Sequence, residues 1–204
     1  MISVRSRKDS GQAFPIYVMM VAGLLFLAFA FFAVGKAAAL RNGSQGGADA
    51  AALAAAQAAR EDIETGFLAA LPLETLDLFL QRPFTRYRPC TEARRLADAN
   101  GNDQRSCAAE YGYPRYKVTV QVEGRKPVDS PVLPGSGRTL AKATATALIE
   151  FRCTWKAVDR TNDGIKDLYI FTCRNGAVFE ISTSSRPDWS RVSKDLFDVR
   201  LVDQ

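Results

Sequence analysis

The most reactive side chains in this sequence are those of four cysteines: Cys90, Cys107, Cys153 and Cys173. None belongs to a CxxC pair, and the chain has no histidine, so a zinc site lacks both its usual spacing and its usual nitrogen ligand. An even number of cysteines on one side of a long apolar segment is typical of disulfides in an oxidising compartment. Four reduced, buried thiols are the alternative.

Other groups that could do chemistry do not combine into a site. One segment resembles the opening of a calcium-binding loop through Asp159, Thr161, Asp163 and Gly164. Ile170 stands where such a loop needs a bidentate acid, so we expect a polar hairpin loop instead. Without histidine, serine and cysteine lack their commonest activating base. Paired carboxylates could hydrolyse a glycoside, but no pair is distinguished, and we predict no enzyme, no cofactor and no metal site.

The cysteines all follow one apolar segment, Ala13 to Val34, which contains no charged residue. About 20 apolar residues in a helix cross the hydrocarbon core of a bilayer, and a soluble core helix is rarely apolar on all sides for so long. We therefore expect a transmembrane helix over residues 13–35. The run exceeds the about 7–15 residues of a signal-peptide core, which favours a retained anchor, although small residues at Ala37–Ala39 resemble a cleavage site.

The two flanks of the apolar segment bear on its orientation. Residues 1–12 contain three basic residues and residues 36–41 contain two, so the charge bias alone is weak. The four cysteines indicate the orientation, because disulfides form in an oxidising compartment. We therefore expect a cytoplasmic N-terminus and an ectodomain outside the cell membrane. The net charge of +5 is spread out, without a basic stripe and interleaved aromatic residues, so nucleic-acid binding is not expected.

Small residues occupy every fourth position after the span: Gly35, Ala39, Gly43, Gly47, Ala51, Ala55 and Ala59. On a helix we expect them to form one narrow ridge against which another helix packs closely. Alternatively, this alanine-rich segment is only a good helix former. We expect the helix to run over residues 36–71 and to be weakened near residues 42–47, where each glycine costs about 1 kcal/mol relative to alanine.

The remaining residues, 72–204, are predicted to form an α+β domain with a mainly antiparallel sheet. A short helix is expected over Leu73–Leu80, and an irregular segment over Gln81–Tyr113. Alternating apolar residues then predict strands over residues 116–122, 143–155, 167–173, 177–182 and, more weakly, 195–202. Asn175-Gly176 is a strong hairpin signal between the third and fourth of these strands.

The register of two predicted strands suggests how the cysteines pair. Cys153 and Cys173 are equidistant from Asp163, which lies in a turn-forming segment. In a hairpin centred there the two cysteines are directly opposed, with Cα atoms about 4.5–5.5 Å apart, a separation that a disulfide can span. We therefore predict Cys153–Cys173 and, by remainder, Cys90–Cys107, although the sequence alone leaves the other two connectivities open.

The N-terminal quarter, about residues 7–60, resembles the TadE/TadG-like proteins of Flp (Tad) pilus assembly systems. The similarity lies in Asp9-Ser-Gly-Gln-Ala13 before the apolar helix and in Ala48-Asp-Ala-Ala-Ala-Leu-Ala54 after it. Some relatives are cut by a prepilin peptidase after a glycine and carry Glu at the fifth mature position. The corresponding junction here is Gly11-Gln12, and Ile16 occupies the fifth position. This departure favours the type that keeps its anchor without cleavage.

The resemblance implies a minor, single-pass component of a type IV-like pilus assembly or secretion machine in the bacterial cell membrane. Its expected partners are other pilus-assembly proteins or pilin subunits that contact the small-residue ridge, and a homo-oligomer is left open. One alternative is an anchored extracytoplasmic binding module unrelated to pili. An anchored hydrolase that depends on carboxylates is the least favoured alternative.

Overall fold

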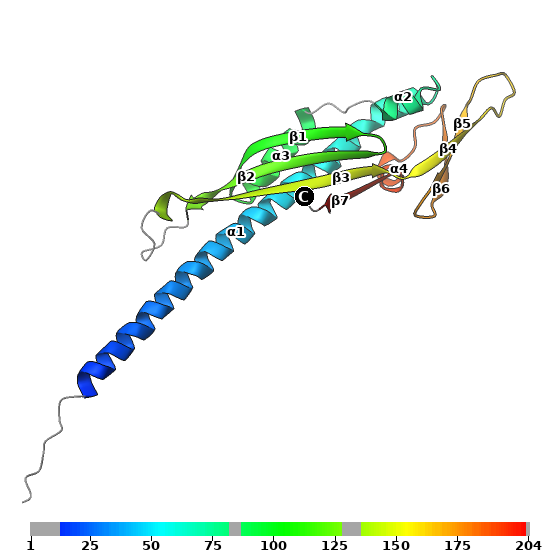
Figure 1. Cartoon of the computed structure of the whole chain (residues 1–204). Helices are drawn as coiled ribbons and strands as arrows, with labels where there is room; N and C mark the ends of the chain where they lie inside the picture. Colours follow the sequence, from blue (N-terminus) through cyan, green and yellow to red (C-terminus); the bar gives the residue numbers. More distant parts are fainter. Residues whose placement is uncertain (1–12, 82–86, 128–135, 203–204) are drawn as a thin grey trace, which may run out of the picture.

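One helix, α1 (Ala13–Ala70), extends from the apolar segment into the centre of the folded domain (Figure 1). The structure, a computed structural model, describes residues 13–81, 87–127 and 136–202. At about 1.5 Å per residue, the 58 residues of α1 span about 87 Å. The helix is continuous through residues 42–47, where glycines led us to expect a weak point. Ser44, Gly47 and Ala48 are buried there, so packing against the domain offsets the poor helix propensity of glycine.

In the part of the chain that the structure describes, the domain adds three shorter helices, one 3₁₀ turn and seven strands to α1. The helices are α2 (Leu76–Leu80), α3 (Tyr87–Ala99) and α4 (Trp189–Leu196), and the 3₁₀ turn η1 covers Ser136–Arg138. The strands are β1 (Asn102–Gly112), β2 (Arg115–Pro127), β3 (Leu140–Phe151), β4 (Cys153–Val158), β5 (Leu168–Cys173), β6 (Val178–Ser182) and β7 (Phe197–Val202).

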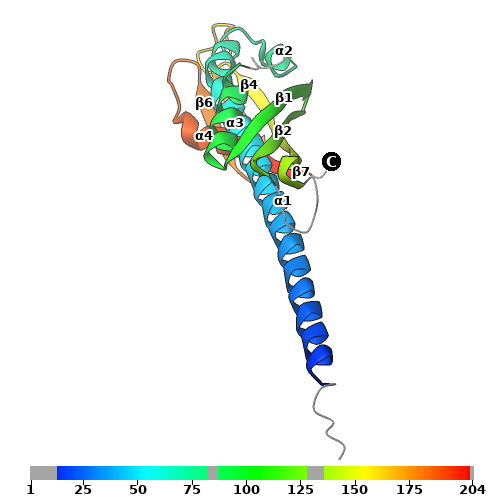
Figure 2. The ribbon, with the colours of Figure 1, turned by 90° about the vertical axis from the view of Figure 1, so that its left-hand side faces the viewer.

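The strands form two antiparallel sheets, which confirms the α+β class. The larger sheet has the order β1-β2-β3-β7 and the smaller one β4-β5-β6. Helices α1 and α3 lie together on one face of the larger sheet, as the two perpendicular views show (Figures 1 and 2). Because successive side chains of a strand point to opposite faces, Val118, Val120 and Val122 of β2 all face this helical layer and are buried.

The core lies between the larger sheet and the second half of α1, and its alanines let the helix approach the strands closely. Ala48, Ala52 and Ala55 are fully buried in it. At its far end the ring of Phe67 is fully buried and contacts aromatic residues of four other elements. The ring centroids lie 5.4 Å from Trp189, 5.8 Å from Phe171 and 6.5 Å from both Phe79 and Phe197. The last third of α1 is therefore a core helix of the domain.

The segment that we expected to be irregular, Gln81–Tyr113, contains regular structure. Helix α3 and strand β1 occupy most of it. Pro89 lies in the first turn of α3, where a missing N–H costs nothing, and Ala93 and Ala97 face α1 and are fully buried. The amphipathic pattern of α3 was obscured by its many arginines and by the nearby prolines.

The long strand predicted over residues 143–155 is two strands in different sheets. The break falls at Arg152, whose backbone N–H donates to the carbonyl of Leu196 over 3.0 Å instead of to a neighbouring strand. The residues before it pair within the larger sheet and Cys153 begins the smaller one. Periodicity alone could not detect this change, because the alternation of apolar and polar residues in the sequence continues across it. The segment before β7 also contains a helix, α4, that the sequence reading missed.

Two disulfides link these elements, Cys90–Cys107 and Cys153–Cys173. They are the two pairs expected from the sequence. Cys153 lies directly opposite Cys173 in the β4–β5 pair, as the hairpin register required. Cys90–Cys107 joins α3 to β1 and so attaches that helix to the edge of the larger sheet.

Candidate functional site: the exposed length of α1

The first half of α1 is almost entirely uncovered by the rest of the chain. Large apolar side chains point outward all around it, and Phe14, Met19 and Phe31 are each about three-quarters exposed, at 74%, 76% and 75%. Among the described residues, α1 is the one helix that is long and apolar enough to cross a membrane. A soluble monomer rarely exposes so large an apolar surface, whereas lipid would solvate it.

The seven small residues do not form one exposed ridge. An α-helix turns by about 100° per residue, so a strict four-residue series advances by about 40° at each step. Six such steps carry the series about 240° around the axis. The first three members, Gly35, Ala39 and Gly43, are therefore exposed. The last four are buried in the chain's own domain: Gly47, Ala51, Ala55 and Ala59.

The change from exposed to buried helix occurs where α1 crosses the end of the larger sheet. A Cβ placed on Gly47 would lie 2.2 Å from Nδ2 of Asn102, and one on Gly124 would lie 2.7 Å from Oγ of Ser44. Both separations are shorter than van der Waals contact. Glycine at these two positions lets the helix and sheet meet, so the exposed part of α1 ends at this crossing.

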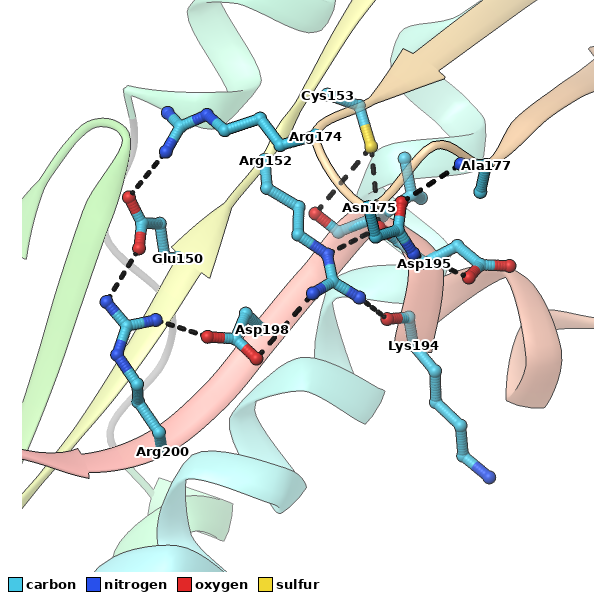
Figure 3. Close-up of polar contacts among 11 residues, drawn as sticks. Glu150, Arg152, Cys153, Arg174, Asn175, Ala177, Lys194, Asp195, Asp198 and Arg200 are labelled. Carbon is cyan, nitrogen blue, oxygen red and sulfur yellow. Dashed lines mark hydrogen bonds and ion pairs between the residues drawn. The ribbon is translucent and has the colours of Figure 1, made fainter.

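A buried carboxylate with three arginine partners lies on the other face of the larger sheet, and Figure 3 shows two of these partners, Arg174 and Arg200. Glu150 of β3 is 5% exposed. Its Oε1 accepts from Nε of Arg115 at 3.2 Å and from Nη1 of Arg174 at 3.1 Å, and its Oε2 accepts from Nη2 of Arg200 at 2.8 Å. The bond from Arg200, followed by those from Arg115 and Arg174, lowers the pKa of Glu150 to about 2, although burial opposes the shift.

This cluster, the Glu150 network, connects the two sheets. Arg115 and Arg200 come from the larger sheet, while Arg174 follows the last strand residue of β5 in the smaller one. Beside it, Arg152 at the break between the sheets donates to the carbonyls of Lys194 and Asp195 at the end of α4, over 2.6 and 3.0 Å (Figure 3). Both carboxylate oxygens of Glu150 are used in ion pairs, so we assign the network a structural role.

Replacing Glu150 by glutamine should remove a pH-dependent part of the domain's stability. A carboxylate with a lowered pKa in the folded state stabilises the fold above its unfolded pKa, about 4.3, and this contribution is lost as the pH falls towards 2. We expect a loss of about 2 kcal/mol at neutral pH, discounted for the exposed arginines. The free energy of unfolding should then fall less steeply between pH 5 and pH 2 than in the wild type.

The control for this measurement is Glu110→Gln on β1. Glu110 is exposed, and the described residues include no ion-pair partner for it. Denaturant unfolding at several pH values measures both variants. An unchanged pH profile in Glu150→Gln would show that the three arginines do not hold this carboxylate ionised.

No metal site emerges from the described residues, among which no group of three or more acidic or cysteine side chains is placed to hold an ion. In the β4–β5 loop, Asp159 accepts backbone N–H groups of Asn162 at 2.6 Å and of Gly164 at 2.8 Å. These contacts make Asp159 the organiser of a tight polar turn, as expected for a hairpin loop. The candidate processing site Gly11-Gln12 lies outside the described residues, and Ile16 is exposed on the first turn of α1.

Residues 11–58 match a family model described as putative Flp pilus-assembly TadE/G-like. The N-terminal part of this chain is TadE/G-like. The match begins just before α1 and ends within it, so the TadE/G-like segment consists of the exposed length of the helix and the first turns that enter the core. This match to the family model associates the chain with Flp (Tad) pilus assembly. No curated protein and no solved structure matches the chain.

The boundary between the exposed and buried parts of α1 is the feature that sequence reasoning missed. The motifs on either side of the apolar segment indicate the TadE/G-like part, but the four-residue spacing predicts one surface of small residues where the structure has two. A helical projection at about 100° per residue shows that the seven positions spread over about 240°, but only the contacts with the sheet decide which of them are exposed.

Proposed function

We propose that this chain is a single-pass, membrane-anchored minor component of a Flp/Tad pilus assembly or secretion system. Residues 1–12 are placed in the cytoplasm, residues 13–35 in the membrane and the domain outside. The chain acts by packing the exposed part of α1 against other helices and by contacts of the domain. The observation that carries the proposal is that the TadE/G-like match falls on the exposed, apolar length of α1.

The proposed orientation is supported by the disulfides. Both lie in the domain, on the C-terminal side of the candidate span, and disulfides persist in oxidising compartments outside the cytoplasm. A cytoplasmic domain would keep these four cysteines reduced. Alkylation of intact cells without reductant should therefore leave all four cysteines unmodified.

The helix-packing part of the proposal predicts which small residues matter. Ala39→Leu with Gly43→Leu should lower crosslinking to partner helices about tenfold, because two bulky side chains keep the helices apart at a cost of about 1.4 kcal/mol. Gly43 has open space around its Cβ position, so the domain should remain folded. The measurement is photocrosslinking in membranes, followed by identification of the attached proteins.

A matched control places the same two leucines on another side of the helix. Ala38→Leu with Asn42→Leu changes exposed neighbours of the same spacing, about 100° around the axis. Crosslinking in this control should equal that of the wild type. If both pairs behave alike, the small residues serve only as a spacer. If the attached proteins have no connection with pili, an anchored binding module becomes the better account.

A further inference from the structure

The end of the domain nearest the apolar segment has an excess of basic side chains. We call it the basal surface. Its basic residues are Lys36, Arg41, Arg105, Arg125, Lys126, Arg138 and Lys142. Its acidic residues among those described are Asp49, Asp98, Asp103 and Glu123. These residues come from α1, α3, η1 and the three strands whose ends meet at this edge (Figure 1).

Ion pairs within the basal surface neutralise only some of these charges. Arg125 binds Asp98 and Asp103 with N–O distances of 2.6 and 2.7 Å, and Glu123 binds both Arg105 and Lys142. Three other basic residues, Arg41, Lys126 and Arg138, are exposed and form no ion pair with a described residue. The surface therefore presents unneutralised positive charge.

The basal surface lies close to the end of the candidate membrane span. Gly124 of β2 packs against Ser44 of α1, and β2 continues three residues further, to Pro127. Three strand residues extend about 10 Å. Figures 1 and 2 show that β2 crosses α1 obliquely and that this last part of β2 lies towards the apolar segment, so its end is at most about six or seven helix residues nearer to Val34 than Ser44 is.

Burial along α1 supports the same placement. On the side of the helix that faces the domain, Ser44 and Ala33 are each 3% exposed, and Ala37 and Leu40 are half-buried. Exposure on this side of α1 is therefore low as far as the last turn of the apolar segment. Headgroups occupy roughly 5–8 Å on either side of the hydrocarbon core, so the basal surface reaches the headgroup layer when residues 13–35 span the membrane.

We propose that the basal surface binds anionic phospholipid headgroups of the membrane in which α1 is anchored. The inference rests on the anchoring part of the proposed function. Basic residues near an anionic bilayer surface each strengthen the attraction about fivefold, and the attraction falls off within a Debye length of about 8 Å at physiological salt. The domain would therefore rest against the bilayer instead of standing away from it on a bare helix.

The test measures how well the membrane shields Lys126. The full chain is reconstituted in nanodiscs of phosphatidylcholine alone or of phosphatidylcholine with an equal part of phosphatidylglycerol. Acetylation of Lys126 is timed by mass spectrometry and compared with Lys156, an exposed lysine of β4 remote from the basal surface. We expect Lys126 to react at least about fivefold more slowly in the anionic discs, and high salt should abolish the difference.

Two variants of equal charge change separate local contact from overall charge. Arg138→Glu should remove the protection of Lys126, whereas Arg160→Glu, at an exposed position in the β4–β5 loop, should leave it intact. Equal acetylation of Lys126 in both kinds of disc would overturn the proposal. Protection in native membranes but not in anionic discs would also overturn it, since a protein would then cover the surface. A chain that does not enter nanodiscs would refute the membrane anchor itself.

Discussion

Replacing Phe67 by alanine is expected to destabilise the domain by about 3–5 kcal/mol, the range for a fully buried phenylalanine. The ring has no exposed surface and is surrounded by aromatic side chains from both sheets, α2 and α4. Its removal leaves a cavity among rings too large and rigid to fill it. Because native domains are stable by only about 5–15 kcal/mol, much of the population should unfold at moderate denaturant concentrations.

The fluorescence of Trp189, whose ring lies 5.4 Å from that of Phe67, reports this unfolding in detergent. Phe32→Ala is the matched control, because Phe32 lies on the same helix but is 69% exposed outside the domain. Its unfolding curve should coincide with that of the wild type. A loss below about 1 kcal/mol in Phe67→Ala would mean that the two sheets and α1 do not share one core.

The variants Gly47→Leu and Gly43→Leu should differ in which property they lose, although both replace a glycine of the same helix. The first should lose stability of the domain, and the second only contacts with other helices. At Gly47 the first added carbon already overlaps the side chain of Asn102, so Gly47→Leu should cost about 3 kcal/mol and separate α1 from the end of the sheet. At Gly43 nothing lies within 4 Å, and the domain should keep its stability. Gly43→Leu should impair only contacts with other helices.

Two measurements on the same pair of variants distinguish these outcomes. Resistance to proteolysis reports whether the helix remains seated on the sheet, and crosslinking in membranes reports association. Gly47→Leu should fail the first measurement, and Gly43→Leu only the second. If Gly47→Leu is as resistant as the wild type, Asn102 must move aside at little cost, and the crossing of helix and sheet is looser than its geometry indicates.

Local signals were enough to predict several features of this fold. The length and apolarity of residues 13–34 predicted the exposed helix. The Asn175-Gly176 turn predicted the β5–β6 hairpin, and Gly176 has the positive φ of 84° that such a turn requires. The pairing of Cys153 with Cys173 followed from counting residues on either side of a turn, because antiparallel register is a matter of position alone.

Features that depend on distant contacts could not be predicted in the same way. Strand β1 became recognisable only beside β2, with which it pairs along its whole length. The break at Arg152 depends on the carbonyl of Leu196, 44 residues later in the chain. The division of the small-residue series depends on which side of α1 the sheet covers. None of these three facts leaves a periodic trace in the local sequence.

The continuity of α1 has a mechanical consequence. The chain has no hinge between residues 13 and 70, so the apolar segment and the domain core are parts of the same rod. Rotation of this rod about its axis turns the whole domain by the same angle, and a pull along it acts as shear between the helix and the sheet. Any motion imposed on the apolar end of α1 is therefore transmitted along the helix to the domain at its other end.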